Sequence, residues 1–539
     1  MQYAQRTRLS RFQRLRNWLN NDGLRERLYP FVIIAGAYLL AMMGGYAIGA
    51  TKFGIFVVGG MVAGIAGIVI GLRPQFGLYI LIFFVFTNMS DVLEVAFDIP
   101  DSNKALVALI FVGTIASVVL YNKPLIFRGP EIAVLAFGMA ILLSLFAAER
   151  DTNVVPPPPP SVDAETGEAI FTKTPDMADI MIDWFKDFAI LFVIVQLSTT
   201  ERVWKNTHWI LICAAGFLAA LSVYQTVSKD YKNDFYGLAK APVHEITAGN
   251  DSVRLTGPLD DPNYYAMIHV MALPTAVYLF VSTKSYIGKA IAAVLGMLIL
   301  GTILFTFSRG AFLGLVVIGI LTIRDLKLNP YKIALMGALL IAILSPVMPK
   351  GFTDRMATLG GILPQGDAKM QTESSFRGRT SEALVAVQMY ADNPILGVGK
   401  RNYAKNYLQY SSRLGLDDRL EDRQAHSLYL ETAAEGGTVG LMVFGIMMFV
   451  VFRETFTAKK LLRITGRHDL VHRVTGIQLG LVGYLMCSIF LHSDYERYFW
   501  LVVAMALGCS VLAAEKYRQY EAQRQNAVID LQQETYVVG

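Results

Sequence analysis

The sequence predicts an all-α, polytopic membrane protein with about 12–14 transmembrane helices. Of its 539 residues, 54% are hydrophobic and only 17% are charged, whereas soluble proteins have about 25% charged residues. Apolar runs of about 17–22 residues recur along the chain, which is the length that a helix needs to cross a bilayer. We expect spans at 30–50, 53–71, 75–90, 104–121, 130–148, 179–197, 207–227, 264–282, 287–306, 310–323, 332–349, 437–453, 475–491 and 497–514.

The distribution of Lys and Arg predicts the orientation of these spans. If the N-terminus is cytoplasmic, every short basic loop falls on the cytoplasmic side, as the positive-inside rule requires. The formal net charge of +5 therefore reflects topology, and we expect no nucleic-acid partner. The basic positions on this side lie in 6–27, 73, 123–128, 202–205, 284–289, 324–332, 453–473 and 516–524.

The spans divide the chain into five regions. We expect a basic cytoplasmic segment at 1–29 and a transmembrane bundle at 30–349, whose outer loops are 149–178 and 228–263. A polar loop domain at 350–436, helices at 437–514 and a cytoplasmic tail at 515–539 follow. Within the loop domain, turn-forming residues predict a helix at 379–391 that ends at 392–394, and a second at 424–435 that is broken at Gly436 and Gly437.

Two arginines are expected at the outer membrane edge. Arg254 lies in RLTGPLDDPNYYAM, where Asn263 is a candidate cap for the next helix. Arg309 lies in TFSRGAF, between two apolar runs, where an arginine is costly unless it is paired or faces water. Both can bind phosphate oxygens through the guanidinium. The alternatives are a well-capped loop for the first motif, and pairing of Arg309 with Asp260 or Asp261, or snorkelling, for the second.

The loop domain supplies further candidates. Arg379 is expected at the start of a helix, where free N–H groups favour anions, and Arg377 lies just before it. His426 begins HSLYLETAAEGG, which also contains Glu435. A helix start disfavours the imidazolium, so a neutral His426 is a candidate base. Solvation of the arginines and a structural role for the histidine are the alternatives.

Lys186 is the remaining candidate, because it falls inside an expected span in MIDWFKDFAILF. A charged residue at that depth is a functional candidate by default. Its alternative is an ion pair with Asp183, three residues earlier in the same helix.

Cations grouped on the outer side, together with one histidine, fit a lipid-linked diphosphate substrate. Arg254, Arg309 and Arg379 would hold the diphosphate and stabilise it as a leaving group. His426 would accept the proton of an attacking hydroxyl. No nucleotide-binding glycine loop is apparent, and we expect neither a cofactor nor a metal, although Asp260 and Asp261 are possible ligands.

The motifs RLTGPLDDPN, TFSRGAF, GRTSEAL, NPILGVGKRNY and HSLYLETAAEGGTVGL occur in an order that resembles the O-antigen ligase family. This family includes O-antigen ligases, polysaccharide polymerases and protein O-glycosylation ligases. The resemblance implies a GT-C-like fold in the bacterial inner membrane. It also implies inverting, metal-independent transfer of a glycan from undecaprenyl diphosphate at the periplasmic face, to a glycan, lipid A-core or protein acceptor. Arg254, Arg309, Arg379 and His426 match the family's functional positions, and Lys186 matches a basic residue on an earlier helix.

The chain departs from the family pattern at two places. Ser427 follows His426 where the family commonly has Asn, and the loop at 149–178 and the N-terminus are large. A ligase and a polymerase therefore both remain open. A transporter or flippase of a lipid-linked glycan is the alternative function, but it predicts mid-membrane charges and internal repeats. As an enzyme, the protein should place His426 near Arg254 or Arg309.

Overall fold

The computed structural model describes residues 73–99, 102–120, 124–150, 177–247, 250–331, 374–416, 423–492 and 496–538, with short pieces at 67, 69–70, 161–162, 169–170 and 338. The expected span 30–50, most of the spans 53–71 and 332–349, and the segment 1–29 lie outside the described residues. The chain forms two compact units, Met1–Leu78 with Ala105–Ile126, and Tyr79–Lys104 with Phe127–Gly539.

The first unit contains the start of α4 (Pro74–Thr87) and most of α6 (Ser102–Leu120). Gly77 packs against Ile110, because a Cβ added at Gly77 would lie 2.6 Å from the Ile110 side chain. The missing side chain thus allows the two helices to approach closely.

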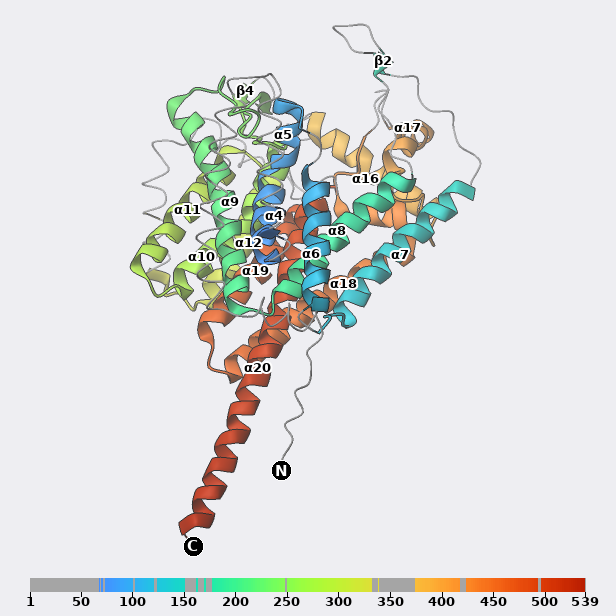
Figure 1. Cartoon of the computed structure of the whole chain (residues 1–539). Coiled ribbons are helices and arrows are strands. Elements are labelled where there is room, and N and C mark those ends of the chain that lie inside the picture. Colours follow the sequence, from blue (N-terminus) through green and yellow to red (C-terminus); the bar gives the residue numbers. More distant parts are fainter. Residues whose placement is uncertain are drawn as a thin grey trace, which may run out of the picture. The chain divides into compact units, whose positions relative to one another are not determined.

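The second unit contains the remaining helices and two short antiparallel hairpins (Figure 1). The hairpins pair β1 (Ser161–Val162) with β2 (Ala169–Ile170), and β3 (Val243–Thr247) with β4 (Asn250–Val253). The helices are α5 (Met89–Phe97), α7 (Gly129–Arg150), α8 (Met177–Leu197), α9 (Glu201–Ser228), α10 (Pro262–Ser282), α11 (Tyr286–Phe305), α12 (Arg309–Asp325), α16 (Ser374–Asp392), α17 (Tyr403–Leu414), α18 (Leu428–Ile464), α19 (His468–Cys487) and α20 (Glu496–Val538).

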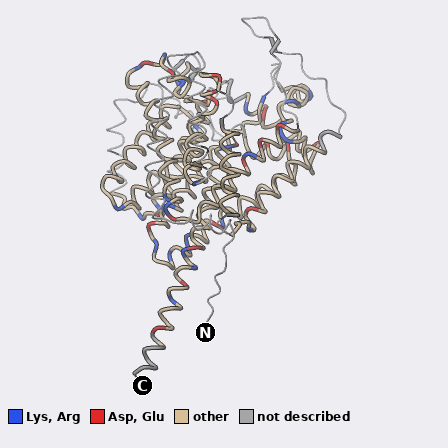
Figure 2. Tube along the Cα trace, viewed as in Figure 1, with Lys and Arg blue, Asp and Glu red and all other residues tan. Residues whose placement is uncertain are grey.

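The predicted fold class, a helical polytopic membrane protein, is confirmed. Seven helices among the described residues are long and apolar enough to span a bilayer, or eight if α4 and α5, bent by 70°, form one span. Figure 2 shows that Lys, Arg, Asp and Glu of the second unit gather mainly towards helix ends, while the helix middles are almost free of charge. This is the distribution that lipid imposes on spanning helices.

The pair α10 and α19 forms the centre of the second unit. In each of the two helices, 78% of the most apolar 18-residue stretch is buried, and the two helices pack extensively on each other. Gly476 and Gly480 of α19, spaced as GxxxG, face the α10 backbone: a Cβ at Gly476 would lie 3.2 Å from Thr275, and one at Gly480 would collide with the carbonyl of Met271. Small residues at this spacing let helices approach closely in a membrane.

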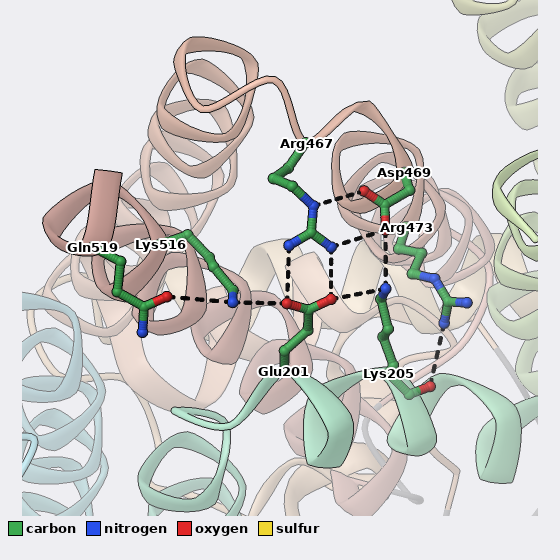
Figure 3. Close-up of polar contacts among 7 residues, drawn as sticks. All are labelled: Glu201, Lys205, Arg467, Asp469, Arg473, Lys516 and Gln519. Atoms are coloured by element: carbon green, nitrogen blue, oxygen red, sulfur yellow. Dashed lines mark hydrogen bonds and ion pairs between the residues drawn. The ribbon is translucent and has the colours of Figure 1, made fainter. Parts of the chain in front are cut away.

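The helices of the second unit alternate in direction between two ends, and charged residues mark one of them. Side chains from the start of α9, the α18–α19 turn, the start of α19 and the middle of α20 meet there, and we call it the basic end (Figure 3). The opposite end carries the starts of α10, α12, α18 and α20. The basic end is made by Glu201, Lys205, Arg467, Asp469, Arg473 and Lys516.

Two predicted element boundaries need correction. The helix expected at 379–391 begins five residues earlier, at Ser374, although it ends at Asp392 as expected. The helix expected at 424–435 begins four residues later, at Leu428, and is counted with the span at 437–453 as one element, α18. The predicted break at the glycine pair is confirmed, because Gly437 has non-helical φ 61° and ψ −160° and the helix is kinked there. Gly437 can adopt this conformation because it has no side chain.

Candidate active site

Two glycines join the loop domain to the bend in α18. Gly397 has φ 70°, and a Cβ added to it would lie 2.5 Å from the carbonyl oxygen of Ala434. A Cβ added to Gly437 would lie 2.6 Å from the backbone nitrogen of Leu396. The two backbones therefore meet directly, and we call this the glycine contact. It is closed by hydrogen bonds from the N–H groups of Val398, Gly399, Thr438 and Val439 to the carbonyls of Ala434, Glu435, Pro394 and Ile395, at 2.9, 3.0, 2.8 and 3.1 Å.

A small apolar core supports the loop domain behind this contact. It joins α16, α17 and the first turns of α18, so His426 is held by packed helices and not by a free loop. Burial of several aliphatic and aromatic side chains gives such a cluster most of its stability. Its fully buried members are Val385, Ala386, Met389, Tyr403, Tyr407, Ala425 and Ala434.

His426 lies just before the start of α18. Its φ is 42°, a left-handed conformation that is strained for a residue with a side chain. The next helical N–H, that of Leu428, donates to the carbonyls of Ser488 and Leu491 at 3.0 and 2.7 Å. The segment after α19 therefore supplies hydrogen-bond acceptors for the first N–H group of α18. His426 is fixed at this junction with a third of its side chain exposed.

Glu382 of α16 is the carboxylate next to His426. Its Oε2 lies 4.0 Å from His426 Nε2, while its Oε1 accepts a hydrogen bond of 2.9 Å from Arg423. Only 2% of Glu382 is exposed. Tyr403 donates to its backbone carbonyl at 2.6 Å, which fixes the turn of α16 that carries it. A buried carboxylate beside a partly exposed imidazole can orient the ring and stabilise its protonated form.

His492 connects His426 to the membrane helices. The two imidazole rings meet edge to face with centroids 5.1 Å apart. The hydroxyl of Tyr264, in the first turn of α10, donates to the His492 carbonyl at 2.9 Å and lies 2.8 Å from its Nδ1. If that hydroxyl proton serves the carbonyl, Nδ1 is the donor of the second bond, which fixes the tautomer of His492.

Arg254 joins the same cluster from the other side of Tyr264. Its Nη2 donates to Oδ1 of Asn263 at 3.3 Å, and its Nε donates to the carbonyl of Thr306 at 2.8 Å. These two acceptors orient the guanidinium. Arg254 is 6% exposed. The predicted sites Arg254 and His426 are thus linked through Asn263–Tyr264 and His492.

Arg309 is the first residue of α12, next to the turn that accepts from Arg254. Ser308 caps this helix, since its hydroxyl accepts from the N–H of Ala311 at 3.4 Å. Gly310 packs against Phe490, where an added Cβ would lie 3.2 Å away. The start of α12 therefore lies beside the segment that carries His492, and its N-terminal N–H groups favour an anion there.

Two predictions for the polar candidates need correction. Asp261, and not Asn263, caps α10: its Oδ1 accepts from the N–H groups of Asn263 and Tyr264 at 2.6 and 3.0 Å. Arg379 is not at a helix start, because α16 begins at Ser374, so the free N–H groups of the helix start lie five residues before it and do not add to an anion site at Arg379. Asp260, an alternative partner for Arg309, forms an ion pair with Lys240 at 2.9 Å.

Lys186 and Glu435 lie in other ion pairs. Lys186 pairs with Asp183 at 3.0 Å, which was the alternative reading, and Arg401 binds the other oxygen of Asp183 at 3.2 Å. Glu435 accepts from the N–H of Tyr403 at 3.2 Å. Arg377 lies in the first turn of α16, and its side chain is outside the described residues.

Lys400 and three carboxylates form a cluster that the sequence did not reveal. Its Nζ lies 3.6, 3.4 and 3.2 Å from Glu431, Glu435 and Glu496. Burial alone would lower the pKa of Lys400, but these carboxylates raise it above its ordinary value. The cluster fixes the turn after Gly399 to α18 and α20. A cavity beside it is lined by Phe137, Phe444, Tyr484, Phe499 and Trp500, among others.

The residues missed by sequence reasoning are the partners of His426. His492 lies in LHSDYER, a short polar segment between two apolar runs, and that position was an available signal. Glu382 lies in GRTSEAL, and Tyr264 follows Asn263. In the part of the chain that the structure describes, no group of three or more His, Cys, Asp or Glu side chains is arranged to hold a metal ion.

The fold and the cluster define a class: a polytopic helical membrane protein with arginine, histidine and glutamate side chains gathered at one end of its helices. Residues 293–445 match the Wzy_C family model, described as O-antigen ligase. This part of the chain is therefore similar to the O-antigen ligase family, and the matched residues include Arg309, α16, the glycine contact and His426. Arg254, Tyr264 and His492 lie outside the matched residues. No curated protein matches the chain significantly.

Proposed function

We propose that the protein is a glycosyltransferase that moves a glycan from an undecaprenyl-diphosphate-linked donor to an acceptor hydroxyl at the periplasmic face of the bacterial inner membrane. The observation that carries this proposal is the connected cluster of Arg254, His492, His426 and Glu382, which extends the O-antigen ligase domain onto the membrane helices.

The donor diphosphate would lie against Arg254 and Arg309. Asn263 and Thr306 orient the guanidinium of Arg254, and a guanidinium that is held in place can bind phosphate oxygens through its planar array of N–H groups. Arg309 adds a second cation and the N-terminus of α12. Arg379 and Arg377 would contact the glycan or the diphosphate from α16. The lipid tail would lie among the apolar helices.

His426 would act as the base, with Glu382 as its positioning residue. The acceptor oxygen attacks the anomeric carbon while the bond from that carbon to the diphosphate oxygen breaks. The acceptor proton passes to His426, and the electron pair of the broken bond leaves with undecaprenyl diphosphate, stabilised by the arginines. A single displacement of this kind inverts the anomeric configuration, and its charge balance is met by arginine without a metal.

The basic end supports the proposed orientation of the protein in the membrane. Loops that the positive-inside rule assigns to the cytoplasm supply Lys205, Arg467 and Lys516, and these meet at one end of the helices. Arg254, Arg309 and His426 lie at helix ends of the opposite polarity. This arrangement supports cytoplasmic termini and a periplasmic site.

The test is complementation of a deletion strain with Arg309→Ala, His426→Ala and the matched control Arg324→Ala, which removes an arginine from the other end of α12. At equal expression, we expect surface glycan to be lost in the first two and retained in the control. Restoration of glycan by either His426→Ala or Arg309→Ala would remove the catalytic assignment.

The lipid-linked material that accumulates in the deletion strain distinguishes the two enzyme types. Long carrier-bound chains indicate a missing ligase, and single repeat units indicate a missing polymerase. A transporter is distinguished by purified protein in detergent, where no compartments exist: an enzyme still joins donor to acceptor there, and a transporter does not.

A further inference from the structure

A cavity of about 650 Å³ lies at the basic end, away from the residues of the proposed glycosyl-transfer site. It lies between the turn that joins α10 to α11 and the turn that joins α18 to α19. Its size is in the range of small-ligand sites. The side chains that characterise it are Lys205, Lys284, Arg467, His468, Asp469 and Arg473.

The lining of this cavity is strongly cationic. Four Lys and Arg side chains face one carboxylate, that of Asp469. Both oxygens of Asp469 are already engaged, Oδ1 by Arg467 at 3.0 Å and Oδ2 by Lys205 at 2.9 Å. Arg467 also binds both oxygens of Glu201, at 2.9 and 2.6 Å (Figure 3). The carboxylates of Asp469 and Glu201 are therefore already paired with some of these cations, and they do not balance the positive charge of the others.

Arg473 and Lys284 are these remaining cations. Arg473 is 6% exposed, and its Nη1 donates to the backbone carbonyl of Lys205 at 3.3 Å (Figure 3). Its Nε is buried and has no hydrogen-bond acceptor among the described residues. Lys284 is exposed at the rim and forms no ion pair within the described part of the chain. A buried guanidinium N–H without an acceptor is costly and indicates a missing anionic partner.

Thr283 supplies a second unsatisfied group in the same cavity. Its Oγ1 is buried and lacks a hydrogen-bond partner among the described residues. A hydroxyl, a guanidinium and an ammonium that converge on one space match the oxygens of a phosphate group.

The surroundings place this cavity at a membrane surface. Tyr286 and Ile287, two and three residues after Lys284, are 89% and 74% exposed at the start of α11, a candidate membrane span. An exposed tyrosine beside a lysine at the end of a span is typical of the level of lipid headgroups. A headgroup there could reach Lys284 at the rim and Arg473 at the wall.

We propose that this cavity binds a phosphate group, carried either by the headgroup of an anionic phospholipid or by free phosphate. The phosphate would connect the α10–α11 turn to the α18–α19 turn through Thr283, Lys284 and Arg473. This site lies at the other end of α10 and α19 from Tyr264 and His492, so it is separate from the binding of the glycan donor.

Thermal unfolding of the purified full-length chain tests the proposal. One arm titrates inorganic phosphate against sodium chloride at matched ionic strength, which separates a specific site from screening. The other arm uses nanodiscs of phosphatidylcholine with and without phosphatidylglycerol. Stabilisation in the first arm identifies free phosphate as a ligand, and stabilisation in the second identifies a lipid headgroup; either supports the site.

Lys284→Gln and Thr283→Val are the informative variants, because both are expected to fold. We expect Lys284→Gln to weaken the apparent affinity about tenfold, as loss of one charge-assisted contact should. Lys289→Gln is the matched control, since Lys289 lies in the first turn of α11, just after Lys284 in the chain, is over the ring of Phe280 at 5.8 Å and does not line the cavity. The proposal is overturned if neither arm stabilises the protein, or if Lys289→Gln weakens binding as much as Lys284→Gln.

Discussion

The glycine contact gives the most direct test of how the loop domain is held. Replacing Gly437 with Ala places a side chain on a residue with φ 61° and ψ −160°, a conformation that is essentially restricted to glycine and costs about 1–3 kcal/mol for other residues. The new Cβ would also collide with the backbone of Ile395 and lie 2.6 Å from the nitrogen of Leu396. Backbone atoms cannot rotate away as a side chain can, so the contact must open.

Opening the contact weakens the hydrogen bonds around it. The N–H groups of Thr438 and Val439 donate to the carbonyls of Pro394 and Ile395 at 2.8 and 3.1 Å. Each such bond contributes about 1 kcal/mol net. Together with the backbone strain, Gly437→Ala should cost about 3–5 kcal/mol, a large part of the stability of an ordinary domain.

Gly436 provides the matched control one residue away. It is helical, and an added Cβ would meet nothing within 4 Å. Gly436→Ala should therefore leave stability unchanged or raise it by up to about 1 kcal/mol, because alanine favours the helix. The assay is thermal unfolding in detergent together with limited proteolysis of the loop domain. We expect early cleavage near the 393–399 turn in Gly437→Ala alone. Equal melting and cleavage of the two variants would refute the reasoning.

Three further predictions concern the candidate site and its supporting helix. Arg254→Lys should fold but lower kcat/KM at least about tenfold, because an ammonium cannot reproduce the oriented guanidinium. Steady-state kinetics with a lipid-linked donor measures this change, and unchanged kcat/KM would exclude a role for the guanidinium. Glu382→Gln should lower kcat about 10–100-fold with little change in KM. It should also move the acid limb of the pH–rate profile to lower pH, because the carboxylate that stabilises protonated His426 is gone. If Glu382 had a purely structural role, that limb would stay in place. Asp261→Ala should lower the unfolding free energy by about 1 kcal/mol through loss of the α10 cap, while Asp261→Asn should keep most of the stability that the cap provides. If both variants melt at the same temperature as the parent chain, the cap does not stabilise the protein.

The helical fold was predictable because lipid imposes a length and a composition on every span. The expected span at 264–282 corresponds to α10, Pro262–Ser282, and that at 287–306 to α11, Tyr286–Phe305. The errors occur where a helix continues beyond the lipid. Helix α18 runs to Ile464 and α20 to Val538, because backbone hydrogen bonding continues into water where hydropathy gives no signal.

The candidate site was predictable only in part, since each motif reports local chemistry and not its long-range partner. His426 was found because its segment combines a histidine with a glycine pair, but Glu382 is 44 residues away and His492 is 66 residues away along the chain. The capping error was avoidable. Asp261 followed by Pro262 places an N-cap residue before proline at the first helical position, which is a stronger signal than Asn263.

The strained backbone of His426 explains why glycines outside the candidate site should affect its chemistry. A left-handed histidine persists only where its surroundings determine its conformation. Two sets of contacts do so: the glycine contact fixes the bend of α18 at Gly437, and the N–H of Leu428 binds the carbonyls of Ser488 and Leu491 at the end of α19. His426 is held between them, facing Glu382 and His492. If either set opens, the histidine can relax to an unstrained backbone and turn away from the arginines. In Gly437→Ala, glycan transfer should therefore fall by more than the loss of folded protein accounts for.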